Sequence, residues 1–235
     1  MKILQLKPTV VIGAQGQVFK IFGTALSREA ETEILKRTTS PILSALDTGE
    51  QIRIVETTWQ KDNILVLKMA KGEVLSARYG EQETYISLVA NLLARRHSEI
   101  LSVDGGCEGQ LLGDFIVDHL FWDKETKIMT FIDPGANYLV YADLGEDCAR
   151  YIYSVFAVHR WRPIHAAKLV TEFVKCYLRS SPLDKANLEK ALKFRYGRSV
   201  QKFRNQKTAT RAVLATLLMA AHKFMILRIL RRFDV

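Results

Sequence analysis

The sequence LGDFIVDHLF at residues 112–121 and the sequence FIDPG at residues 131–135 decide the fold of this chain. Each stretch places an aspartate, Asp114 or Asp133, beside a short apolar run, and the charged residues 123–127 lie between them. This pattern predicts a loop, a strand, a tight turn and a second strand that returns the chain to its start. We therefore expect Asp133 to lie beside Asp114. Two carboxylates held this close repel each other unless a cation lies between them or one keeps its proton.

Phosphoryl transfer uses such a pair: one carboxylate takes or orients a substrate hydroxyl, and another holds Mg²⁺ on the nucleotide phosphates. The run 113–115, His119 five residues after the first aspartate, the hairpin and the second aspartate resemble the catalytic core of the aminoglycoside-phosphotransferase and protein-kinase-like superfamily. The resemblance implies ATP and Mg²⁺ as cofactors. It also implies Asp114 as catalytic base, Asp133 as the main Mg²⁺ ligand and His119 at a metal-binding position that is usually Asn.

Two residues depart from the family pattern. Leu112 stands where the family usually has His or Arg, and His119 replaces Asn. A neutral imidazole binds divalent metals, although Mg²⁺ prefers oxygen. A His at this position is also similar to the bacterial lipopolysaccharide inner-core sugar kinases. The departures therefore leave two hypotheses open, an active kinase and a non-catalytic pseudokinase.

The N-terminal region alternates in the manner of β-strands at residues 2–6, 9–12 and 17–22. The sequence GAQG at residues 13–16 favours a plain hairpin turn over a nucleotide-covering loop. Lys20 lies in a run that resembles the strand carrying the family's phosphate-binding lysine. In the helix expected from residue 27, the family's Arg-Glu pattern favours Glu29 as the partner of Lys20, helix phase allows Glu33, and a solvated acidic first turn is the alternative.

Residues 52–56 and 63–69 have the composition of two further strands. The second resembles the strand that leads into the family's interlobe hinge. This resemblance implies that backbone groups of Lys68, Met69 and Ala70 face an adenine, and that residues 71–72 form a turn.

Residues 79–100 carry apolar side chains at helical spacing, which predicts a buried helix face. His97 near the end of this run is more typical of a helix C-cap than of a catalytic group. Residues 142–153 resemble a family helix in which Asp147 would accept hydrogen bonds from the catalytic-loop backbone, whereas Asp143 could cap the helix instead. The basic and aromatic sequence HRWRPIH at residues 159–165 predicts either a surface turn or contact with an anionic substrate.

The net charge of +9 is unevenly distributed along the 235 residues. Residues 185–235 hold thirteen Lys or Arg and two acids, a net of +11, so the other 184 residues carry −2. Basicity therefore belongs to a helical tail, and nucleic acid is not an expected partner of the folded body. Lys207, Arg211, His222 and Arg232 share one arc of the last helix, which suits an anionic membrane surface. Packing of this helix on the large lobe is an equally compatible alternative.

The three cysteines form no CxxC pair, and the N-terminal apolar run is too short for a secretory signal. These features indicate a reducing compartment, so we expect the protein in the cytoplasm, in solution or peripherally on the inner face of the membrane.

These patterns and the resemblance predict an α+β fold of the two-lobe protein-kinase-like type. Its expected parts are a β-rich nucleotide lobe at 1–70, a helical catalytic lobe at 71–184 and a basic helical extension at 185–235. The expected function is an ATP- and Mg²⁺-dependent phosphotransferase that acts on a hydroxyl of a small molecule or of a lipid-linked envelope sugar. The alternative is a kinase-like binding or scaffold protein without catalytic activity.

Overall fold

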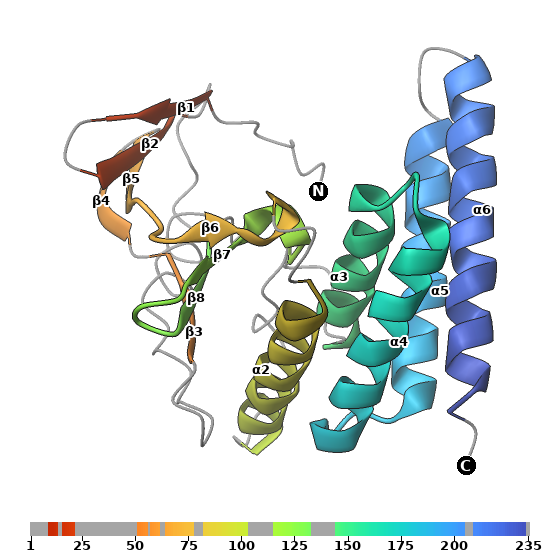
Figure 1. Cartoon of the computed structure of the whole chain (residues 1–235). Coiled ribbons are helices and arrows are strands. Elements are labelled where there is room, and N and C mark those ends of the chain that lie inside the picture. Colours follow the sequence, from red (N-terminus) through yellow and green to blue (C-terminus); the bar gives the residue numbers. More distant parts are fainter. Residues whose placement is uncertain are drawn as a thin grey trace. The chain divides into compact units, whose positions relative to one another are not determined.

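A computed structural model describes residues 9–13, 16–21, 51–55, 57–61, 64–77, 82–102, 115–132, 144–204 and 209–233. Contacts within the chain divide it into two units (Figure 1). The first unit joins Met1–Ala77 to Leu112–Val140 and carries all the strands of the described residues; the second joins Arg78–Leu111 to Tyr141–Val235 and carries the long helices. The segment Leu112–Val140 thus belongs with the β-rich unit, so this unit is discontinuous in sequence.

The first sheet of the β-rich unit has the strand order β1-β2-β5-β4. Its strands are β1 (Thr9–Ile12), β2 (Gln17–Ile21), β4 (Thr57–Lys61) and β5 (Ile64–Lys68), and all neighbours are antiparallel. Their β-branched and aromatic residues suit a pleated, half-buried surface. β1 and β2 form the hairpin that the sequence favours, closed by Gly16 at a φ of 71°. If GAQG is a plain hairpin turn and β2 carries the family's lysine, the family's glycine-rich loop would fall near residues 7–8. These two residues lie outside the described residues.

The second sheet contains the hairpin that the sequence predicts. Its strands are β3 (Gln51–Ile54), β6 (Glu73–Val74), β7 (Leu120–Asp123) and β8 (Ile128–Phe131), in the order β3-β8-β7-β6. β7 and β8 pair antiparallel from Leu120 opposite Phe131, and both of these side chains are fully buried. The charged residues 123–127 form the tight turn, which confirms the predicted loop, strand, turn and strand.

Gly72 makes the turn after β5 that the sequence also predicts. Its φ is 89°, and a Cβ at this position would overlap the backbone carbonyl of Trp122 on β7. Only glycine satisfies both constraints without strain. This close approach lets the short strand β6 pair with β7.

The second unit is a set of five packed helices among the described residues. They are α2 (Gln82–Ser102), α3 (Gly145–Val158), α4 (Pro163–Ser180), α5 (Lys185–Arg204) and α6 (Ala209–Arg231). α2 packs on α4, α3 packs on α4 and α5, and α5 packs on α6 (Figure 1). The predicted apolar face of α2 is buried at Tyr85, Leu88, Val89, Leu92 and Leu93.

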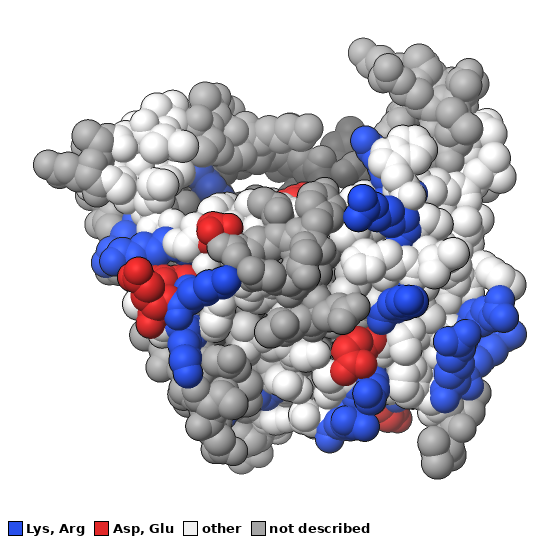
Figure 2. Space-filling view, viewed as in Figure 1, with Lys and Arg blue, Asp and Glu red and all other residues white. Residues whose placement is uncertain are grey.

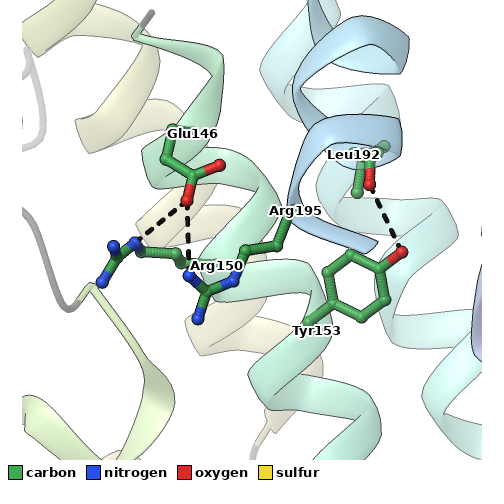
Figure 3. A network of polar contacts seen from close by, with 5 residues as sticks. All are labelled: Glu146, Arg150, Tyr153, Leu192 and Arg195. Atoms are coloured by element: carbon green, nitrogen blue, oxygen red, sulfur yellow. Dashed lines mark hydrogen bonds and ion pairs between the residues drawn. The ribbon is translucent and has the colours of Figure 1, made fainter. Parts of the chain in front are cut away.

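A buried polar network joins α3 to α5. The carboxylate of Glu146, 2% exposed, accepts hydrogen bonds from Arg150 at 3.3 Å and from Arg195 at 3.4 Å (Figure 3). Burial raises the pKa of Glu146, although both guanidinium groups oppose that shift. Beside it, the Tyr153 hydroxyl donates to the Leu192 carbonyl at 3.4 Å (Figure 3). The basic segment after residue 184 therefore contributes to the packing of the helical unit.

Helix α6 packs through its C-terminal half. Ile226, Ile229 and Leu230 are buried, and the ring of His222 stacks on Phe156 of α3 at 4.9 Å. His222 is only 3% exposed, and desolvation lowers its pKa, so its expected place on a solvent-facing basic arc was wrong. The periodicity of α6 does not reveal which face turns inward. No helix among the described residues is long and apolar enough to cross a membrane.

We predict that Gly72→Ala destabilises the protein by at least ~1 kcal/mol, because the new methyl group needs a left-handed backbone and space that the Trp122 carbonyl occupies. Gly197→Ala is the matched control. Gly197 is exposed within α5 and has no neighbouring atom within 4 Å of an added Cβ, so the substitution should stabilise by ~0.5–1 kcal/mol. Urea denaturation of both variants measures the two effects, and equal midpoints for Gly72→Ala and the parent would contradict the prediction.

Candidate functional site

Lys20 lies in the middle of the first sheet, on β2. It pairs with Leu65 of β5, and its side chain is half-buried. Its ammonium group donates a hydrogen bond to the backbone carbonyl of Ile132 at 3.4 Å. A partly buried lysine needs such polar partners. The contact brings a cation from β2 to the residue that immediately precedes Asp133.

The two ends of the β7–β8 hairpin are fixed to each other by the backbone. His119 closes a short 3-10 turn, Val117–His119, in which its N–H donates to the Ile116 carbonyl at 3.0 Å. The N–H of Ile132 donates to the His119 carbonyl at 3.0 Å. This bond extends the ladder by one step, so position 119 and the residue before Asp133 lie opposite each other.

Aromatic packing supports this hairpin end from the core. The rings of Phe115 and Phe131 meet edge to face at 5.5 Å, and both side chains are fully buried. Phe115 immediately follows Asp114, so the residue next to the predicted base is anchored in the core. The His119 ring lies 6.5 Å from Phe131 and is half-buried, while Asp118 beside it is exposed.

The predicted hinge residues follow β5. Lys68 pairs with Gln17, and the N–H of Met69 donates to the Gly16 carbonyl at 2.6 Å. The Met69 side chain is 48% exposed. Because the Met69 N–H is already bonded to the β1–β2 turn, any contact of an adenine with this residue has to use another group.

Four residues of the predicted site lie outside the described residues. They are Asp114, Asp133 and the two candidate partners of Lys20, Glu29 and Glu33. Their roles stay predictions, as does the expected proximity of the two aspartates.

Solved structures of phosphotransferases share this architecture across nearly the whole chain. Aminoglycoside phosphotransferase APH(2")-IIa in complex with gentamicin aligns with a TM-score of 0.56 at 11% identity, covering 94% of this chain and 90% of that one. The GDP complex of aminoglycoside 2'-phosphotransferase-IIIa gives 0.57 at 9% identity over 93% and 89%, and a Plasmodium vivax ethanolamine kinase gives 0.51 at 10% identity over 92% and 75%. The chain has the protein-kinase-like fold of the aminoglycoside phosphotransferases. No family model and no curated protein matches the sequence.

Within the helical unit of this kinase-like fold, Asp147 occupies the first turn of α3. It is fully buried, and its Oδ2 lies 3.9 Å from Nε2 of His97 on α2. The other ring nitrogen of His97, Nδ1, is hydrogen-bonded to the Tyr177 hydroxyl of α4 at 2.6 Å. These contacts join three helices around one buried imidazole. The predicted role of Asp147 toward the catalytic loop stays a prediction.

The expectation that His97 caps a helix was wrong. α2 continues to Ser102, and His97 is a fully buried residue within it. The sequence contained a signal for this, because His97 lies four and eight residues after Leu93 and Val89 and therefore on the same buried face. A polar residue at such a position needs a partner from another element.

Among the described residues, no three His, Cys, Asp or Glu side chains gather as a metal site. The hairpin register places the backbone of His119 opposite that of Ile132, the residue before Asp133, and the metal-binding roles of His119 and Asp133 stay predictions. An imidazole nitrogen with a carboxylate is a workable donor set for Mg²⁺ and a better one for Mn²⁺.

We predict that Tyr177→Phe costs ~1–3 kcal/mol, because it leaves the buried Nδ1 of His97 without its 2.6 Å partner. Tyr153→Phe is the control, since it loses a hydroxyl whose contact with Leu192 is long at 3.4 Å. Chemical denaturation of both variants, of His97→Leu and of the double variant His97→Leu/Tyr177→Phe gives the coupling energy between His97 and Tyr177. Equal losses in the free energy of unfolding for Tyr177→Phe and Tyr153→Phe would show that the hydrogen bond to His97 stabilises the protein no more than the Tyr153–Leu192 contact does.

Proposed function

We propose that this protein is an ATP- and Mg²⁺-dependent phosphotransferase that acts on an alcohol group. The observation that carries the proposal is the hydrogen bond from Lys20 to the Ile132 carbonyl. It places a lysine of the first sheet beside the residue that precedes Asp133. The comparisons support it, since the similar structures include a GDP complex, an ADP-bound enzyme and an ethanolamine kinase. A lysine, a metal-binding carboxylate and a base carboxylate are the groups that phosphoryl transfer requires.

Each residue has one task in this proposal. Asp114 orients the acceptor hydroxyl and removes its proton as the oxygen attacks. Asp133 and His119 hold Mg²⁺, which neutralises charge on the phosphate oxygens when it is bound. Lys20 donates to a phosphate oxygen and so holds the transferred group in line, with either Glu29 or Glu33 orienting the ammonium. Catalysis then consists mainly of positioning and electrostatic stabilisation.

The adenine would lie against the residues that follow β5. Backbone groups of Lys68, Met69 and Ala70 would face it. The exception is the Met69 N–H, which already bonds to the Gly16 carbonyl in the β1–β2 turn. In the helical unit, the buried carboxylate of Asp147 would fix backbone amides of the catalytic loop, which is a supporting role without contact to substrate.

The acceptor class is proposed to be a polyol or sugar. One similar structure binds gentamicin, and the net charge of +11 over residues 185–235 favours an acceptor linked to an anionic lipid or envelope glycan. Non-catalytic nucleotide binding is the second candidate, and the substitutions at Leu112 and His119 favour it. Nucleotide binding without phosphate transfer to any acceptor would select this second function.

We predict that Lys20→Met weakens Mg·ATP binding by ~10- to 100-fold, the scale of one lost charge-assisted hydrogen bond. Asp133→Asn should remove the Mg²⁺ dependence of ATP binding, because it deletes the charge that the metal needs. Lys124→Met, an exposed lysine in the β7–β8 turn, is the matched control and should bind normally. Calorimetric titration with ATP in Mg²⁺ and in EDTA measures these affinities, and unchanged Mg·ATP binding in Asp133→Asn rejects the metal assignment.

We predict that Asp114→Ala lowers turnover by ~10²–10⁴ while Mg·ATP affinity stays near normal, as expected when only a general base is lost. Phosphate release and transfer to a panel of aminoglycosides, amino alcohols and sugars measure turnover. Asp118→Ala is the control, because Asp118 is an exposed carboxylate in the same segment. If Asp118→Ala abolishes turnover and Asp114→Ala does not, the base has been assigned to the wrong aspartate.

A further inference from the structure

The turn between α3 and α4 displays apolar side chains that a soluble surface rarely exposes. Trp161 is 85% exposed and Ile164 is 76% exposed, which makes them the two most exposed large apolar side chains among the described residues. They are three residues apart, one in the turn and one in the first turn of α4. With their neighbours they line an open depression of about 390 Å³ whose lining residues are Trp161, Arg162, Pro163, Ile164, His165 and Lys168. We call these six residues and Arg160 the Trp161 platform.

The Arg and Lys residues of the platform give it charge of one sign. Arg160, Arg162 and Lys168 are exposed, and the guanidinium of Arg160 lies 5.4 Å from the centre of the Trp161 ring. The sequence contains no Asp or Glu between Asp147 and Glu172. Figure 2 shows that Lys and Arg also predominate over acids on the visible face of the helical unit. The platform itself therefore presents no carboxylate to an anionic partner.

The backbone of the α3–α4 turn holds the side chains of Trp161 and Ile164 on the surface. The N–H of Arg162 donates to the His159 carbonyl at 2.7 Å, and the N–H of His159 donates to the Val155 carbonyl at 3.0 Å. His159 is 3% exposed and its ring meets the edge of the His165 ring at 5.0 Å. Pro163 then starts α4, whose next turn is buried at Ala166. Trp161 and Ile164 are held on a rigid corner and cannot withdraw into the core without unwinding it.

We propose that the Trp161 platform is a docking site for an anionic lipid membrane, with Trp161 and Ile164 inserted at the headgroup level and the three cations against lipid phosphates. Trp is the side chain that best suits a membrane–water interface, and cations beside the bilayer gain from its negative surface potential. The aliphatic Ile164 beside the ring favours lipid over a nucleic acid, whose bases stack on aromatic rings. The site goes beyond the proposed phosphotransferase activity and does not depend on it.

The platform is a better candidate for this contact than the C-terminal half of α6, where Ile226, Ile229 and Leu230 are buried by packing on neighbouring helices. α6 still exposes Leu217 at 62% and Phe224 at 67%, so these two residues provide a matched pair of exposed apolar side chains on another element.

The test is co-sedimentation of the full chain with vesicles of phosphatidylcholine alone and of phosphatidylcholine with 30% phosphatidylglycerol. Binding should require the anionic lipid. The variants Trp161→Ala/Ile164→Ser and Arg160→Glu/Arg162→Glu should each bind at least ~10-fold more weakly, because the first loses the inserted groups and the second the lipid-facing charge. Leu217→Ser/Phe224→Ser should bind like the parent. All altered side chains are exposed, and an unchanged thermal midpoint confirms that each variant is folded.

Insertion has its own readout. Lipids brominated in the acyl chains should quench the tryptophan fluorescence of the parent, and Trp161→Phe should bind comparably but lose this quenching. Binding that is lost only in Leu217→Ser/Phe224→Ser overturns the proposal and moves the contact to α6. Absence of vesicle binding, or binding only to a single-stranded polynucleotide that the platform variants abolish, also overturns it.

Discussion

One backbone hydrogen bond, from the Ile132 N–H to the His119 carbonyl, organises the candidate site. It continues the β7–β8 ladder one step beyond the pair Leu120 and Phe131. The Lys20 ammonium bonds to the carbonyl of that same residue, Ile132, so both polar groups of one peptide segment are engaged. Because a one-residue slip would turn the Phe131 side chain away from the core, the buried Phe115–Phe131 contact also fixes this register.

The helical unit holds buried polar groups within its apolar core. His97, Asp147 and Glu146 are each 2% exposed or less, and their partners come from other helices or from the next turn. Such groups are costly when unsatisfied, so they specify one arrangement of α2, α3, α4 and α5 more sharply than aliphatic contacts can. One basic residue of α5 takes part in this arrangement, because Arg195 brings its charge to the buried carboxylate of Glu146, which also pairs with Arg150.

Sequence patterns predict the elements formed by residues close together in the chain. They do not predict contacts between residues far apart in the chain. The β7–β8 hairpin, the β1–β2 hairpin and the buried face of α2 follow from short-range alternation, and each is confirmed. The parallel pairing of β3 with β8 joins residues 51–54 to residues 128–131, and no local pattern encodes it. His97 and His222 were misplaced for a related reason: helical period shows that residues share a face but not which neighbour covers it. The roles of Asp114 and Asp133 rest on resemblance and remain predictions.

The packing of α5 and α6 offers another explanation for the basic charge of residues 185–235. Net charge alone suggested a membrane-binding tail, yet Leu188, Ala191 and Leu192 of α5 and Ile226, Ile229 and Leu230 of α6 are buried, so both helices belong to the core of their unit. Lys190, Lys193, Arg228 and Arg231 lie on the exposed faces of these helices, whereas Arg195 pairs with the buried Glu146. The charge is therefore explained by solvation and does not by itself require a lipid. What packing does not explain is an aromatic ring 85% exposed on a rigid turn between two arginines, and this makes the Trp161 platform the stronger indication of a surface partner.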